Sequence, residues 1–173
     1  MILYPKEYFN NVREISIKFL RKNAIKALIL DVDNTLIDYD KNLAEETIKW
    51  AENLKKEGIK LYILSNSNKK DKVKTVAEKL NVEYEYFGKK PLKMGFKKVQ
   101  KKLKEKPENI GVVGDQIFTD VLGGNRCKMF TILVDPIAEK DIWITLIKRP
   151  IENAIKHRYK KIKEGECGER SHT

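Results

Sequence analysis

The chain has 173 residues, and its 36 Lys and Arg residues outnumber its 25 Asp and Glu residues to give a net charge of +11. Hydrophobic residues make up 41% of the chain, which excludes a fully disordered protein. The longest strictly apolar run, Ala27–Leu30, is far shorter than the roughly 20 residues that span a bilayer. We therefore expect one globular domain over residues 1–164, followed by a polar tail over residues 165–173.

Helical and strand patterns of apolar residues alternate along the chain. In chain order they predict a helix over 7–22, a strand over 26–31, a helix over 43–57, a strand over 59–64, a helix over 70–80, a strand over 82–87, a helix over 93–105, a strand over 110–114, a short helix over 117–122, a strand over 129–134, and a helix over 141–163 that is interrupted at Pro150. Gly58 is expected to end the second helix, and Gly123 and Gly124 to end the short one. This alternation predicts an α/β fold, a Rossmann-like three-layer α/β/α arrangement around a mostly parallel sheet.

Polar clusters follow four of the predicted strands. They are residues 31–36, 65–68, 89–91 and 114–120. In a parallel α/β sheet the ligand lies beyond the carboxyl ends of the strands. Because all four clusters fall at that edge, we expect their side chains to lie close together.

Four carboxylates in these clusters, those of Asp31, Asp33, Asp115 and Asp120, would repel one another without a cation. Ligation by oxygen atoms alone suits Mg²⁺. Ser65, together with a lysine that is either Lys90 or Lys93, would add hydrogen-bond donors for phosphate oxygens. Each cluster alone is also compatible with a turn or a helix cap. In this order, and each after a strand, they favour phosphoryl transfer.

The clusters together resemble the motifs of the haloacid dehalogenase superfamily of phosphotransferases. The resemblance assigns seven positions: the nucleophile Asp31, the general acid/base Asp33, the Thr35 that follows it, Ser65 of the second motif, Lys90 of the third, and Asp115 and Asp120 of the fourth. Residues 114–126 further resemble the subfamily of bacterial YqeG proteins and mitochondrial phosphatidylglycerophosphate phosphatases. The resemblance implies a Mg²⁺-dependent phosphomonoesterase that works through an aspartyl-phosphate.

The resemblance also implies how the ligands are held. Asp31, the backbone carbonyl of Asp33, and Asp115 would bind Mg²⁺, while Asp120 would either bind the ion or orient a water on it. The phosphate-binding residues would be Thr35, Ser65, Asn66 and Lys90. Tyr39-Asp40 replaces the Trp-Asp pair that this family is expected to carry, a departure that bears on the substrate rather than on the reaction.

The spacing between motifs leaves no room for the cap domain found in many members of this superfamily. Only 29 residues separate Thr35 from Ser65, and 23 separate Asn66 from Lys90. A capless core with an open site suits a large substrate, and the resemblance favours phosphatidylglycerophosphate. A phosphoprotein, a nucleic-acid end and a small phosphate ester remain alternatives. A phospho-aspartate switch protein is the non-enzymatic alternative, although Asp33 would let the intermediate turn over.

The positive charge is concentrated after residue 88, where 20 basic and 11 acidic residues lie. The predicted basic helix at 151–163 could lie on an anionic membrane, but an ordinary helix packed on the sheet is favoured. No nucleic-acid partner is expected, because the basic residues lack interleaved aromatics. Cys127 and Cys167 suggest no disulfide framework. A cytoplasmic location is therefore expected, with peripheral membrane association and the oligomeric state left open.

Overall fold

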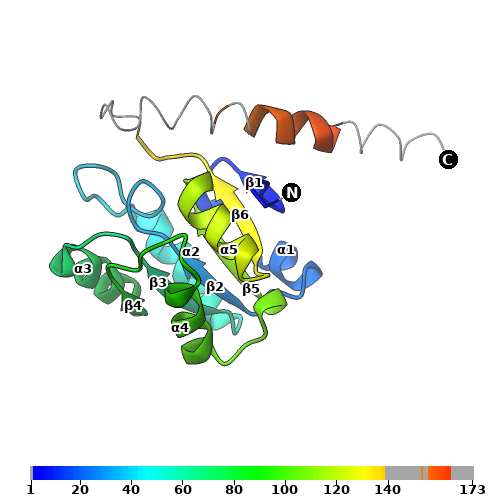
Figure 1. Cartoon of the computed structure of the whole chain (residues 1–173). Helices are drawn as coiled ribbons and strands as arrows, with labels where there is room; N and C mark the ends of the chain where they lie inside the picture. The colour runs from blue at the N-terminus through cyan, green and yellow to red at the C-terminus, as the bar shows by residue number, and fades with distance from the viewer. Residues whose placement is uncertain (1, 139–152, 154–155, 165–173) are drawn as a thin grey trace.

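A six-stranded parallel sheet organises the chain, seen here in a computed structural model that describes residues 2–138, 153 and 156–164 (Figure 1). The strand order is β1-β6-β5-β2-β3-β4, and every neighbouring pair is parallel. The strands are β1 (Glu7–Phe9), β2 (Ala27–Leu30), β3 (Lys60–Leu64), β4 (Glu83–Glu85), β5 (Ile110–Gly114) and β6 (Phe130–Val134). The chain adds strands on one side of β2 and then on the other, so the sheet has its switch point between β2 and β5.

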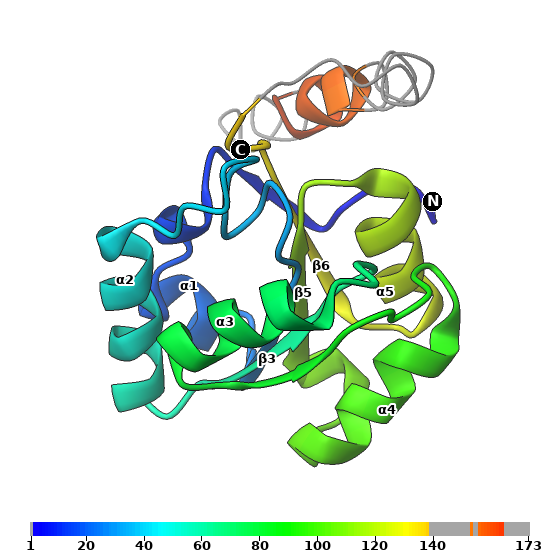
Figure 2. The same ribbon diagram turned by 90° about the vertical axis from the view of Figure 1, so that its left-hand side faces the viewer.

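Helices cover both faces of the sheet (Figure 2). They are α1 (Ile17–Lys22), α2 (Glu45–Lys56), α3 (Lys70–Leu80), α4 (Lys93–Leu103) and α5 (Leu122–Arg126). The buried residues of α1, α2 and α3 pack with Leu61 and Ile63 in one core cluster. Those of α4 pack with Tyr62 and Leu64 in another. Successive residues of β3 therefore point to opposite faces, as the pleat of a strand requires. The predicted three-layer α/β/α fold is confirmed.

The prediction of one continuous helix over residues 7–22 is wrong. Residues 7–9 form β1, which pairs with β6 at the edge of the sheet, and α1 begins only at Ile17. A 3₁₀ turn over Val12–Glu14 lies between them. The Ser16 side chain accepts a hydrogen bond from the Phe19 amide, so Ser16 is the N-cap that starts the helix.

The short helix predicted over residues 117–122 is longer than expected, and the two glycines do not end it. A π-helix over Ile117–Val121 continues directly into α5, which ends at Arg126. A Cβ atom on Gly123 would lie 2.2 Å from the Phe96 ring. Gly123 therefore serves close packing of α5 against α4 rather than helix termination. Gly58, in contrast, follows α2 with a φ of +86°, as predicted for the end of that helix.

The other elements match the prediction to within a few residues, and the connections between them are short. The connection from β2 to β3 consists of a flap over residues 31–44 and of α2. Isolated β-bridges at Ile37 stabilise the flap. Only α3 and its loops connect β3 to β4. Neither connection contains an inserted domain.

The chain after β6 is described only in part. Residues 156–164 are helical, within the helix predicted over 141–163, whereas residues 141–152 and the tail at 165–173 lie outside the described residues. None of the helices that the structure describes is both long and apolar enough to cross a membrane.

Candidate active site

The polar clusters meet at the carboxyl edge of the sheet, where the sequence places them. Asp31 directly follows β2, Ser65 directly follows β3, and Asp115 directly follows β5. The backbone amide of Asp31 donates to the carbonyl of Val113, so Asp31 is still held by the sheet. The position of these side chains is thus fixed by the strands that precede them.

Lys90 lies at the centre of the cluster. Its Nζ is 2.7 Å from Oδ1 of Asp31 and 2.6 Å from Oδ1 of Asp120. The side chains of Lys90 and Asp120 are almost wholly buried. Lys93, the other lysine that the sequence leaves open, is exposed at the start of α4. The structure therefore brings Lys90, and not Lys93, into contact with the carboxylates.

The Lys90 backbone is held in place by Asn66. The Asn66 side-chain amide donates to the Lys90 carbonyl, and the Lys90 amide donates to Oδ1 of Asn66. This double hydrogen bond fixes the loop from which the Lys90 side chain starts. Ser65 is fully buried, and its hydroxyl accepts a hydrogen bond from the Ser67 amide.

Three carboxylates, those of Asp31, Asp115 and Asp120, each place an oxygen within 4.8 Å of the others. The Thr35 hydroxyl lies within hydrogen-bond distance of two of them, 3.2 Å from Oδ2 of Asp31 and 3.4 Å from Oδ1 of Asp115. A Cβ atom on residue 114 would lie 2.2 Å from Asp120, so a glycine there lets this carboxylate approach. Such a set of oxygen ligands fits a hard divalent cation.

Asp33 lies apart from this cluster. Its side chain is about half exposed, and Oδ1 is 2.5 Å from Nζ of Lys72, a residue of α3 that is largely buried. Sequence reasoning missed Lys72. One signal was available, because α3 follows β3 closely and its first turn must lie at the same edge of the sheet as Asp33.

The charges of the cluster depend strongly on one another. Burial raises the pKa of Asp31 to about 6, an effect that Lys90 opposes and Asp120 reinforces. Burial alone would lower the pKa of Lys90, but the carboxylates of Asp120 and Asp31 outweigh it and raise this pKa above the ordinary value. Lys90 is therefore held as a cation by the two carboxylates that it contacts.

An α/β sheet with an aspartate after its central strand, a buried lysine and further carboxylates at one edge fits a phosphomonoesterase of the haloacid dehalogenase superfamily. The family model described as mitochondrial PGP phosphatase matches residues 1–138. The chain belongs to this family.

Comparisons with individual proteins agree with this assignment. The chain is 39% identical over 152 residues to a protein of Bacillus subtilis (strain 168) named probable phosphatase YqeG, covering 87% of this chain and 88% of that one. Two solved structures share the fold. An uncharacterized protein from Listeria monocytogenes serotype 4b has a TM-score of 0.56 and 18% identity over 68% of this chain and 84% of its own. A hypothetical protein from Xanthomonas campestris has a TM-score of 0.52 and 13% identity over 79% and 77%.

Proposed function

We propose that the protein hydrolyses a phosphate monoester in two steps, with Asp31 as the nucleophile. The observation that carries this proposal is the contact of the Asp31 carboxylate with Lys90 on one oxygen and with the Thr35 hydroxyl on the other. A carboxylate oxygen of Asp31 would attack phosphorus, and the bond between phosphorus and the alcohol oxygen would break. Asp31 would then carry the phosphoryl group as an aspartyl-phosphate.

Asp33 would move the protons. It would first donate a proton to the departing alcohol oxygen. In the second step it would take a proton from the water that attacks phosphorus, which breaks the bond to Asp31 and releases inorganic phosphate. The position of Asp33 supports this role, because it lies two residues after the nucleophile with a half-exposed carboxylate beside Lys72.

The carboxylate cluster would hold Mg²⁺ through Asp31, Asp115 and the backbone carbonyl of Asp33, with Asp120 either a ligand or the partner of a bound water. The donor set supports this, since three carboxylates converge and Asp33 directs its own carboxylate to Lys72 instead. When bound, the cation would neutralise charge on the transferring phosphoryl group. Lys90, Ser65, Thr35 and the backbone of Asn66 would orient that group by hydrogen bonds.

Phosphatidylglycerophosphate is the substrate we propose. The family name supports it, as does a fold in which no cap is inserted between β2 and β4. A lipid phosphate needs a site that is open to a membrane surface, so we also propose that the protein works at such a surface.

The Asp31→Asn variant tests this proposal. The amide is a poor nucleophile, so kcat with phosphatidylglycerophosphate in detergent micelles should fall by at least about a thousandfold. Glu52→Gln is the matched control on the exposed face of α2 and should keep activity near that of the wild type. Phosphate release by Asp31→Asn at the wild-type rate would contradict the mechanism. A phosphorylated Asp31 that persists for minutes without releasing phosphate would instead indicate a switch protein.

A further inference from the structure

A pocket of about 590 Å³ lies beside the proposed active site, between the flap and the first turns of α3. Half of the ten residues that line it are lysines: Lys41, Lys69, Lys70, Lys72 and Lys79. Asp71 is the single acidic residue in the lining. The pocket is therefore strongly basic, and the proposed chemistry so far leaves it without a role.

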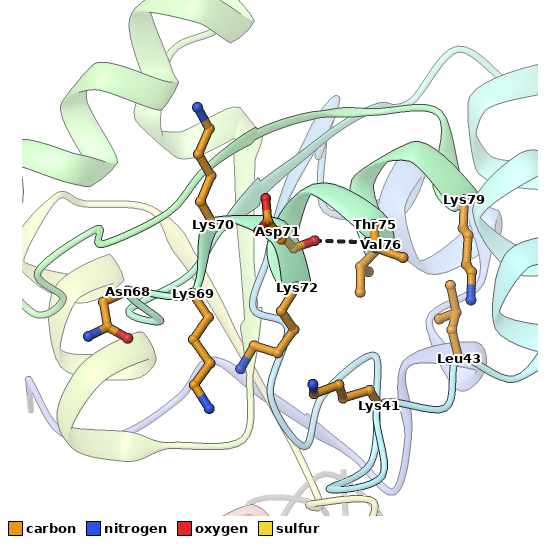
Figure 3. A pocket seen from close by; sticks show the side chains of 10 residues that line it. All are labelled: Lys41, Leu43, Asn68, Lys69, Lys70, Asp71, Lys72, Thr75, Val76 and Lys79. Carbon is orange, nitrogen blue, oxygen red and sulfur yellow. Dashed lines mark hydrogen bonds between the residues drawn. The ribbon is translucent and has the colours of Figure 1, made fainter.

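The lysine side chains are distributed unevenly around the pocket (Figure 3). Lys41, Lys69 and Lys72 extend toward the same side of the pocket, whereas Lys79 lies at its far end beside Leu43. Lys70 extends the opposite way, and its Nζ lies 5.8 Å from the centre of the Tyr86 ring. Asp71 also points away from the three converging ammonium groups. An anion entering from that side would thus meet the ammonium groups of Lys41 and Lys69, and that of Lys72, which also contacts Asp33.

Lys72 connects this pocket to the reaction. Its Nζ is 2.5 Å from Oδ1 of Asp33, the proposed proton donor to the alcohol oxygen. The pocket therefore begins on the side of the scissile bond where the alcohol leaves. An alcohol that extends beyond Asp33 would reach the lysines, and the apolar side chains of Leu43 and Val76 would border its carbon atoms.

We propose that this lysine pocket binds a second phosphate group, carried by the alcohol part of the substrate. Lysine ammonium groups are compact charges that bind phosphate oxygens well, and several of them can share one phosphate. The subsite rests on the proposed function and deepens it. It selects phosphate monoesters whose alcohol bears another phosphate, whether that phosphate is the diester of a lipid or part of a water-soluble molecule.

A double variant, Lys41→Gln with Lys69→Gln, tests the subsite and leaves Lys72 beside Asp33 intact. Three substrates are compared: p-nitrophenyl phosphate, water-soluble glycerophosphoglycerophosphate, and phosphatidylglycerophosphate in micelles. For both two-phosphate substrates, kcat/KM relative to p-nitrophenyl phosphate should fall by about tenfold or more. The matched control replaces two exposed lysines elsewhere, Lys18 and Lys56, with Gln and should leave both ratios unchanged.

The outcomes separate the subsite from the proposed function. Ratios that stay unchanged in the double variant would overturn the proposed subsite but leave the proposed phosphatase activity standing. A fall for the lipid alone would also overturn it, because the lysines would then act on the micelle surface. An equal fall in the control variant would show an effect of net charge and contradict a specific subsite. A wild-type protein inactive on all three substrates would overturn the proposed function, and the subsite with it.

Discussion

A single buried ammonium group holds the candidate site together. Lys90 contacts Asp31 and Asp120 at once, and each of these carboxylates is largely removed from water. Buried charges are tolerated when they are paired, and removal of one partner leaves the others uncompensated. Lys90 should therefore matter both for the reaction and for the folded state.

We expect Lys90→Met to lower the free energy of unfolding by about 3–5 kcal/mol in the absence of divalent cations, because two buried carboxylates lose their counter-charge. The measurement is urea denaturation followed by circular dichroism. Lys93→Met is the matched control at an exposed position and should change this free energy by less than about 0.5 kcal/mol. Equal effects of the two substitutions would contradict the central position of Lys90.

The residues that directly follow strands were predictable from the sequence. Asp31, Ser65 and Asp115 lie where the alternation of strands and helices places them, since that pattern fixes the carboxyl edge of the sheet. The contacts of Asn66 and Lys72 were not predictable in the same way. The first depends on the path of the loop that carries Lys90, and the second on the orientation of α3, and neither leaves a periodic signal.

At the scale of elements, β1 shows how a local pattern misleads. Val12, Ile15 and Phe19 recur at helical spacing, but these residues lie in a 3₁₀ turn, in a connecting loop and in α1, and all pack in the same core cluster. Residues 7–9 form a strand because β6, more than 120 residues later, offers a free edge to pair with. A sequence window cannot contain a partner at that distance.

The contact between α4 and α5 could not be predicted from the sequence for a similar reason. In a sequence, a pair of glycines indicates the end of a helix. In the structure, Gly123 instead packs against the Phe96 ring. The π-helix that carries Asp120 continues into α5 without a break, so this contact also bears on the position of the carboxylate.

We expect Gly123→Ala to destabilise the protein by about 1–3 kcal/mol, because the added methyl group must displace the Phe96 ring or shift α5. Urea denaturation measures this change. Phe96→Leu should make room for the methyl group, so the double variant should lose less stability than the sum of the two single variants. Strict additivity would contradict the steric explanation.

At the scale of the whole molecule, part of the basic charge at the C-terminal end contacts the fold itself. Tyr159 is buried and stacks with Tyr4, with 6.4 Å between the ring centres. Lys160 lies 4.4 Å from the centre of the Tyr8 ring, and Lys163 pairs with Glu7. The described part of this helix therefore packs against the N-terminal segment through Tyr159, whereas Ile162, expected on the packed face, is exposed.

The net charge of +11 still predicts how the whole protein responds to an anionic surface. We expect the wild-type chain to co-sediment with vesicles that contain phosphatidylglycerol, because each lysine near such a surface contributes about 1 kcal/mol of attraction. Raising NaCl from about 0.1 M to about 1 M shortens the screening length from about 10 Å to about 3 Å and should release most of the bound protein. Vesicles of neutral phosphatidylcholine are the control and should bind little at either concentration. Equal binding to both kinds of vesicle, or binding that salt leaves unchanged, would show that the positive charge reflects composition alone.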